Sequence, residues 1–246
     1  MAMKLEVWHG KCQDRIAEAR AAILGMGLQP VIVTDPPFNV GYKYRTYKDK
    51  MPEAEYYEML AKLIDGMPAV VIHYPEALHR LSIELGKAPE RVIEWVYNEH
   101  TKRQHRSIAF YGIEPDMTKI RQPYKNPTDK RVEKLINEGY EGAAIYDWWN
   151  IPTVKNVSKE KTEHPCQMPT EVMNRIVKIL GDGYGVIDPF CGSGTTGVAC
   201  RDNDVPFIGI EMDEKYCQIA RERIANEERS EAGKTYYKQI SLFEAI

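Results

Sequence analysis

The strongest constraint on the fold is a glycine-rich turn, DPFCGSGTTG, at residues 188–197. An apolar, β-branched run at 185–188 leads into this turn, and a helical pattern follows it over 195–201. A second apolar run at 206–211 predicts another strand. Strand, turn, helix and strand in this order predict an α/β fold, in which a mostly parallel sheet carries helices on its faces.

The same turn predicts a cofactor that contains adenosine. Glycines let a ligand approach the backbone, and the start of a helix presents N–H groups that lack partners. Glu211 ends the next strand, where a carboxylate accepts hydrogen bonds from ribose hydroxyls. A nicotinamide dinucleotide is one candidate, although Asp188 at the start of the turn would repel its pyrophosphate. S-adenosylmethionine is favoured because an acidic turn attracts its sulfonium and ammonium groups.

A second unusual turn, Asp35-Pro36-Pro37-Phe38, follows the apolar run at 31–33. The prolines carry no N–H, so this turn presents carbonyl groups and one carboxylate beside an aromatic ring. Such a turn suits a planar amine, whose N–H groups bind the acceptors while its ring stacks on Phe38. The alternative is a proline-rich turn with Phe38 in the core.

The two turns predict one shared pocket. Asp35 and Asp188 both follow buried strands, and strand ends of a parallel sheet meet at one edge. Elsewhere, strands are expected at 5–8, 69–72, 91–97 and, near the end of the chain, 236–242. Helices are expected at 12–24, 52–63, 75–85, 171–180 and 216–226.

The middle of the chain differs in character and predicts a nucleic-acid partner. Residues 101–135 hold nine Lys and Arg against four Asp and Glu, whereas the whole chain has a net charge of −3. The tyrosine-rich segment 41–51 is also basic. A solvated surface region is the alternative for both segments. The residues expected to contact phosphates are Lys43, Arg45, Lys102, Arg103, Arg106, Arg121 and Lys125.

Composition narrows the setting. The chain has no long apolar run and no signal-peptide pattern, which indicates a cytoplasmic protein without a membrane partner. Its five cysteines are odd in number and form no CxxC pair, which argues against a disulfide scaffold or a metal site. The paired Trp148 and Trp149 are expected to be buried.

Together, the DPPF turn, His164-Pro165-Cys166-Gln167-Met168-Pro169, the glycine turn and Gly209-Ile210-Glu211-Met212-Asp213 resemble a known family. It is the permuted, β-type DNA amino-methyltransferases, which modify adenine N6 or cytosine N4. The resemblance implies a Rossmann-like, seven-stranded, mostly parallel sheet with a circularly permuted motif order. It also implies a catalytic half at 1–97, a small target-recognition insertion at 98–160 and an S-adenosylmethionine-binding half at 161–246.

The resemblance also assigns residues. Asp35 and the Pro36 carbonyl would accept hydrogen bonds from the target amine, with Pro37 and Phe38 completing the turn and Phe38 stacking on a flipped base. The cofactor would lie against Asp188, Phe190, Gly192, Gly194, Thr195, Thr196, Glu211, Met212 and Asp213, and beneath His164 and Gln167. The family often has Thr at Cys166, Lys at Met168 and an Asp early in the first strand-turn, where this chain reads His9-Gly10-Lys11-Cys12.

The substrate implied by the resemblance is double-stranded DNA, and Asp35 at the first position of the turn favours adenine N6 over cytosine N4. An RNA methyltransferase, a nicotinamide oxidoreductase and a DNA-binding module without activity stay open as alternatives. A homodimer and a cognate restriction enzyme stay open as further partners.

Overall fold

Eight strands form the main sheet in the computed structural model, which describes residues 4–97 and 102–226. Their order across the sheet is β1 (Leu5–His9), β10 (Phe207–Glu211), β9 (Tyr184–Asp188), β2 (Gln29–Thr34), β3 (Ala69–His73), β5 (His105–Tyr111), β4 (Arg91–Val96) and β8 (Trp148–Asn150). Strand β5 runs antiparallel to both of its neighbours, and the other pairs are parallel. The predicted mostly parallel α/β fold is confirmed. The sheet has one strand more than expected, because β8 pairs with β4 at its edge.

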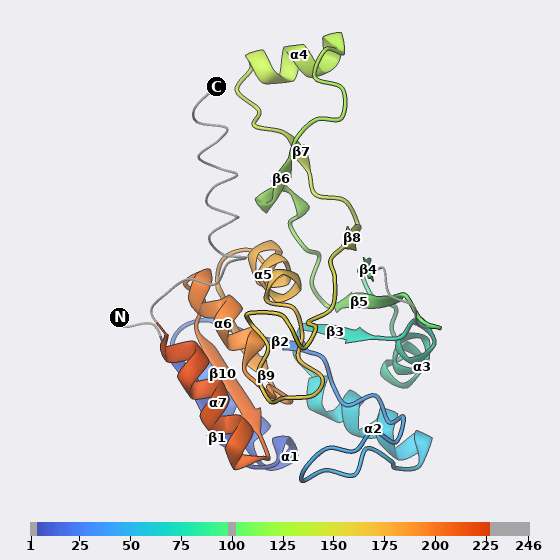
Figure 1. The fold of residues 1–246 in the computed structure, drawn as a ribbon, viewed down its shortest axis with the longest axis vertical. Helices are drawn as coiled ribbons and strands as arrows, with labels where there is room; N and C mark the ends of the chain where they lie inside the picture. The colour runs from blue at the N-terminus through green and yellow to red at the C-terminus, as the bar shows by residue number, and fades with distance from the viewer. Residues whose placement is uncertain (1–3, 98–101, 227–246) are drawn as a thin grey trace.

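Helices cover both faces of this sheet, as Figure 1 shows. They are α1 (Cys12–Leu24), α2 (Glu53–Ile64), α3 (Pro75–Leu85), α5 (Thr170–Ile179), α6 (Thr195–Asp202) and α7 (Glu214–Ala225). Alternation along β2 explains why two layers form: Val31 and Val33 belong to one hydrophobic cluster and Ile32 to the other. The first cluster takes buried residues from α5, α6 and α7, and the second takes them from α1, α2 and α3.

The chain leaves the sheet between β5 and β8 and forms a projecting arm (Figure 1). The arm contains a 3₁₀ turn, η1 (Met117–Lys119), the strand pair β6 (Arg121–Gln122) and β7 (Ala143–Ala144), and α4 (Lys130–Asn137). The expected insertion at 98–160 includes β5 and β8, which belong to the sheet, and the arm between them spans 112–147. Trp149 is buried as expected, whereas Trp148 is 52% exposed.

Two further expectations concern the end of the chain and the cysteines. The strand expected at 236–242 lies outside the described residues. All five cysteines are free thiols. Within 4–97 and 102–226, no helix combines the length and apolarity needed to cross a bilayer.

Candidate active site

The two acidic turns meet in one cavity of about 830 Å³. Strands β2 and β9 are parallel neighbours, so Asp35, just after β2, and Asp188, at the end of β9, emerge at the same edge of the sheet. Both residues line the cavity, as the sequence predicted. Residues 153 positions apart therefore share a site because β9, late in the chain, pairs with β2, early in the chain.

Asp188 organises the floor of the cavity. It is buried, and its carboxylate accepts hydrogen bonds from Thr34 Oγ1 at 2.9 Å, Thr196 Oγ1 at 2.5 Å and the Phe190 backbone N at 3.1 Å. Burial raises the pKa of Asp188 to about 6, and these hydrogen bonds limit the rise. Asp188 therefore ties β2, β9 and the glycine turn together at one carboxylate.

The two glycines of the turn have different surroundings. Both have left-handed backbones, with φ of +50° at Gly192 and +79° at Gly194. A Cβ at Gly192 would come within 2.9 Å of His164 Nε2, inside the cavity lining. A Cβ at Gly194 would come within 2.7 Å of the Cβ of Ala220 on α7. Gly194 does not line the cavity, so its close contact is with a helix.

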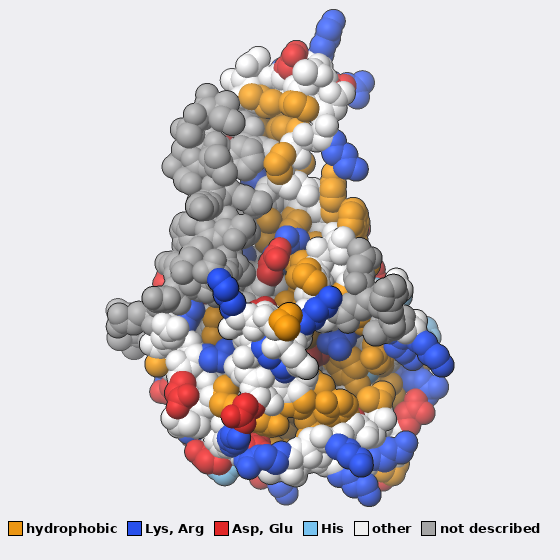
Figure 2. All heavy atoms as spheres, viewed as in Figure 1, with side chains coloured by type: hydrophobic (Ala, Val, Ile, Leu, Met, Phe, Trp, Pro, Cys, Tyr) orange, Lys and Arg blue, Asp and Glu red, His pale blue; other side chains and the backbone are white. Residues whose placement is uncertain are grey.

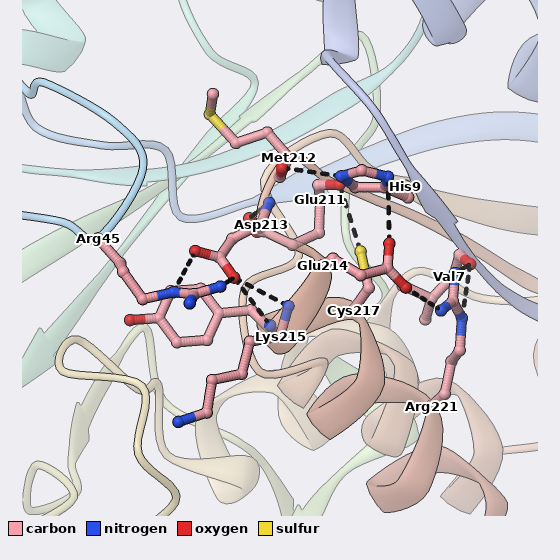
Figure 3. A network of polar contacts seen from close by, with 11 residues as sticks. Val7, His9, Arg45, Glu211, Met212, Asp213, Glu214, Lys215, Cys217 and Arg221 are labelled. Carbon is pink, nitrogen blue, oxygen red and sulfur yellow. Dashed lines mark hydrogen bonds and ion pairs between the residues drawn. The ribbon is translucent and has the colours of Figure 1, made fainter.

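Glu211 ends β10 and Asp213 precedes α7, and the two carboxylates have different partners, as Figure 3 shows for the surrounding network. The Glu211 carboxylate accepts hydrogen bonds from the backbone N of Gly192 at 3.0 Å and of Asp213 at 2.8 Å. Glu211 also lines the cavity. Asp213 is buried and caps α7 by accepting from the backbone N of Lys215 and of Tyr216. Asp213, which the resemblance placed against the cofactor, does not line the cavity.

Arg45 is the partner of Asp213. Its Nε donates to Asp213 Oδ2 at 2.8 Å, and its Nη2 forms an ion pair with the other oxygen (Figure 3). These hydrogen bonds hold the pKa of Asp213 at about 2. The prediction that Arg45 contacts DNA phosphates meets a different arrangement, in which a carboxylate at a helix N-terminus holds the guanidinium.

A chain of hydrogen bonds through Tyr56 and His73, called the relay below, supports the DPPF turn. Tyr56 Oη donates to the Pro37 carbonyl at 2.6 Å and lies 2.9 Å from His73 Nε2. His73 Nδ1 accepts from the Tyr74 backbone N at 2.7 Å, so the ring proton is on Nε2 and points to Tyr56. Burial lowers the pKa of His73 to about 3, so its ring is neutral. Phe38 stacks on this ring with centroids 4.2 Å apart.

Asp35 has one oxygen without a partner. Its Oδ1 is buried and makes no hydrogen bond within the described residues, while Oδ2 lies 3.8 Å from Arg106 Nη1. Burial raises the pKa of Asp35 to about 7, an effect that Asp188 increases and Arg106 opposes. Arg106, which the sequence assigned to phosphate contact, lines the cavity, and its guanidinium lies over Phe38 at 4.8 Å and Trp95 at 5.3 Å.

Segment 39–51 and the segment around His164 form the outer walls. Asp49 is buried and accepts from the backbone N of Asn39, Val40 and Tyr42, which folds the first segment into a fixed loop. That loop contributes Tyr42, Tyr44 and Tyr47 to the lining. His164 packs edge-on against Tyr216, with centroids 4.6 Å apart, and burial lowers its pKa to about 4.

The structure thus brings most predicted site residues to one place. All four residues of the DPPF turn line the cavity, and so do all predicted cofactor residues except Gly194 and Asp213. The lining cofactor residues are Asp188, Phe190, Gly192, Thr195, Thr196, Glu211, Met212, His164 and Gln167. Gln167 is partly committed, because its Oε1 accepts from Thr162 and its Nε2 donates to the Glu160 carbonyl.

The predicted DNA contacts are more dispersed. Apart from Arg106, none lines the cavity. Arg103 pairs with Glu76 and stacks over Tyr74 at 4.0 Å. Lys43 and Lys102 are exposed, and Figure 2 shows Lys and Arg side chains over the lower body and along the arm. On the arm, Arg121 donates to the Gly142 carbonyl at 3.4 Å and Lys125 lies over Tyr146 at 5.4 Å.

Sequence reasoning missed the supporting residues. Tyr56 sits in an ordinary helical pattern and His73 ends an apolar strand, so neither carries a motif. Asp49 follows the basic and aromatic residues for which segment 41–51 was expected to contact DNA. Asp14 also lines the cavity, two residues after the His9-Gly10-Lys11-Cys12 segment. The buried position of Asp49 and the contacts of Tyr56 follow only from the tertiary fold.

The lining suits a cation better than a phosphate. Asp14, Asp188 and Glu211 contribute carboxylates to the cavity lining, together with the ring of Phe190. A nicotinamide dinucleotide would bring its pyrophosphate to this acidic region, which is electrostatically unfavourable. An adenosine that carries a sulfonium and an ammonium fits the same groups.

Comparison with known proteins agrees with this geometry. The model of the DNA methylase family, the N6/N4 methyltransferases, matches residues 76–222. The chain is 26% identical over 221 residues to the Type II methyltransferase M.HpaI of Haemophilus parainfluenzae, covering 80% of this chain and 68% of that protein. It is 38% identical over 121 residues to M.ScaI of Streptomyces caespitosus, covering 47% of this chain and 40% of that one.

Solved structures share the fold. The M1.HpyAVI complex with S-adenosylmethionine has a TM-score of 0.54 at 22% identity, covering 89% of this chain and 98% of that one. The cytosine-N4-specific PvuII DNA methyltransferase has a TM-score of 0.61 at 14% identity, covering 96% and 91%. S-adenosylmethionine is the methyl donor of the family. With a matching family model over more than half of its length, this chain belongs to the N6/N4 DNA methylases.

Proposed function

We propose that this protein transfers a methyl group from S-adenosylmethionine to the exocyclic amine of a base in double-stranded DNA, with adenine N6 as the target. The observation that carries the proposal is the unpartnered, buried Oδ1 of Asp35 in the cavity that the glycine turn also lines. A buried acceptor without a donor is costly unless a ligand supplies one. An amine N–H is such a donor.

The proposed chemistry divides between the two turns. When bound, the cofactor supplies an electrophilic methyl group; Asp188, Phe190 and Glu211 would hold it. Asp35 and the Pro36 carbonyl would accept hydrogen bonds from the two N–H groups of the amine, which moves its nitrogen toward tetrahedral geometry and frees the lone pair. Once methylated, the nitrogen would lose one of these protons to Asp35 or to water. The Pro37 carbonyl already accepts a hydrogen bond from Tyr56, so the acceptors of the turn that would face the substrate are those of Asp35 and Pro36. Positioning and fixed charges supply most of the rate.

The target base must leave the duplex, because its amine is otherwise paired. We propose the arm at 112–147, with Arg121 and Lys125, as the target-recognition region. Lys43, Lys102 and Arg103 would contact phosphates near the cavity. The Type II designation of M.HpaI and M.ScaI supports action at a defined DNA sequence.

The test measures transfer of labelled methyl groups to duplex DNA, followed by digestion to nucleosides. We expect N6-methyladenine as the product. Asp35→Ala should abolish transfer while calorimetry shows little change in S-adenosylmethionine binding. Full transfer by Asp35→Ala would remove the proposed role of Asp35.

Cytosine N4 is the second candidate, and the fold similarity to the cytosine-N4-specific PvuII enzyme favours it. The same digestion separates the two, because N4-methylcytosine and N6-methyladenine differ in mass and retention. Parallel reactions with duplex DNA and with RNA of the same sequence decide the substrate class. Label in RNA alone would overturn the proposal for DNA.

A further inference from the structure

We infer that Arg106 is a positioning residue for Asp35, whose charged carboxylate form it favours for binding the substrate amine. The inference deepens the proposed function and rests on it for the identity of the substrate. The ion pair itself can be tested without any substrate.

The backbone determines where Arg106 points. It lies on β5 opposite Trp95 of β4, and its neighbour Ser107 is buried and donates to Glu94. The Arg106 side chain is 22% exposed. Its guanidinium lies over the rings of Phe38 and Trp95, which holds a planar cation against two aromatic faces. Arg106 is therefore held by packing at the cavity wall.

The polar contacts of Arg106 are weak for a guanidinium that is only 22% exposed. Nη1 is 3.8 Å from Asp35 Oδ2, beyond hydrogen-bond distance, and 3.5 Å from Met168 Sδ, a weak acceptor. Nε is buried and makes no hydrogen bond within the described residues. The charge of Arg106 acts on Asp35 while the oxygens of Asp35 stay available to a donor from elsewhere.

Groups on several elements surround Asp35. Asp188 approaches from β9, Tyr56 from α2, Tyr44 from segment 39–51 and Cys166 from the segment before α5. Burial raises the pKa of each of these neighbours, so Tyr44, Tyr56 and Cys166 are neutral near pH 7. Asp188 repels a second negative charge.

Arg106 opposes both burial and Asp188. Removal of its charge should raise the pKa of Asp35 further above about 7. A protonated Asp35 would lose charge and acceptor capacity, so an amine N–H would be bound less well. Transfer should then require a higher pH.

The experiment uses the full chain and follows Asp35 directly. Carboxyl-carbon NMR of protein labelled at Asp, with Asp35→Asn to assign the signal, gives the pH at which Asp35 ionises. In Arg106→Gln this pH should rise by about one to three units. Arg106→Lys keeps the charge and should restore most of the shift. Arg91→Gln, which breaks an exposed pair with Glu114, is the matched control and should leave it unchanged.

The second readout is the pH profile of methyl transfer in a single turnover. At pH 7 the rate of Arg106→Gln should fall roughly 5- to 500-fold, and it should recover toward the wild-type rate as pH rises. In an Asp35→Asn background, Arg106→Gln should change neither the rate nor its pH dependence, because no charge is left to maintain.

The outcomes separate the two proposals. An unchanged Asp35 titration in folded Arg106→Gln overturns the inference, whatever the activity. A rate loss that is the same at every pH also overturns it and indicates a phosphate or packing role. If wild-type protein methylates no DNA while the titration shifts as expected, the inferred ion pair stands and the proposed function fails. Arg106→Met, similar in length and uncharged, replaces Arg106→Gln if the latter does not fold.

Discussion

Tyr56→Phe tests whether the relay under the DPPF turn holds the active-site backbone in place. The hydroxyl of Tyr56 donates to the Pro37 carbonyl and accepts from His73 Nε2, and Tyr56 is 1% exposed. Its removal leaves the buried His73 Nε2 and the part-buried Pro37 carbonyl without this partner. His73 cannot compensate by moving its proton to Nδ1, because that nitrogen accepts from the Tyr74 backbone N.

Each unsatisfied buried group costs about 1–3 kcal/mol, and the part-buried Pro37 carbonyl costs less than the full amount, so Tyr56→Phe should lower the free energy of unfolding by about 2–5 kcal/mol. The lower end applies if a water molecule enters the space of the lost hydroxyl. Urea denaturation measures this loss, and Tyr57→Phe, at the next position and outside the relay, is the control. The turn should also become less well fixed, so kcat should fall while the Kd of S-adenosylmethionine stays close to that of wild type.

The reasoning is refuted if Tyr56→Phe and Tyr57→Phe unfold at the same urea concentration. It is also refuted if Tyr56→Phe is destabilised but retains full kcat. In that case the relay would stabilise the fold without positioning the turn.

Three other predictions follow from the contacts described above. Gly194→Ala should cost about 2–4 kcal/mol, from its left-handed backbone and the contact with α7, whereas Gly27→Ala, with φ of +76° and open space, should cost only about 1 kcal/mol in urea unfolding. Asp35→Asn should be more stable than wild type by about 2–4 kcal/mol above pH 7 and by little near pH 4. The pKa of Asp35 is raised in the folded protein, so wild type loses stability between about pH 4 and pH 7 as this carboxyl ionises. Urea titrations of both proteins at each pH that show a constant difference would contradict this. Arg45→Gln should speed hydrogen exchange of the amides of residues 40–48 relative to Lys50→Gln, because the ion pair to Asp213 is lost; equal exchange would mean that Asp49 alone orders the loop.

The sequence predicted the sheet well where the signal is local. The apolar runs of β2, β3, β9 and β10 are bounded by turns, and their helices follow at ordinary spacing, so strand and helix positions agreed with the structure within a few residues. β8 was not predicted, because three residues, Trp148–Asn150, carry no periodicity and are strand only through pairing with β4.

The positions of charged side chains were harder to predict. Arg106 looked like a phosphate contact because it belongs to a basic stretch, yet β5 turns it into the cavity. Residues 107–111 of this strand are all buried, so no alternation indicates which way Arg106 points. Arg45 and Asp213 are 168 positions apart, and the sequence around each residue gives no signal that the two side chains pair. The motifs identified the DPPF turn and the glycine turn, whereas the charged side chains next to them could be identified only from the fold.

The adjacency of β2 and β9 has a consequence for how the protein is made. Nascent chain emerges from the N-terminus, so β2 is complete long before its neighbour β9 is synthesised, and one edge of β2 waits without a partner. A ribosome that stalls before residue 188 releases a product with the DPPF turn but no glycine turn. Such a fragment could not assemble the pocket, so unfinished copies would be inert, and their open β-strand edge would mark them for chaperones or aggregation.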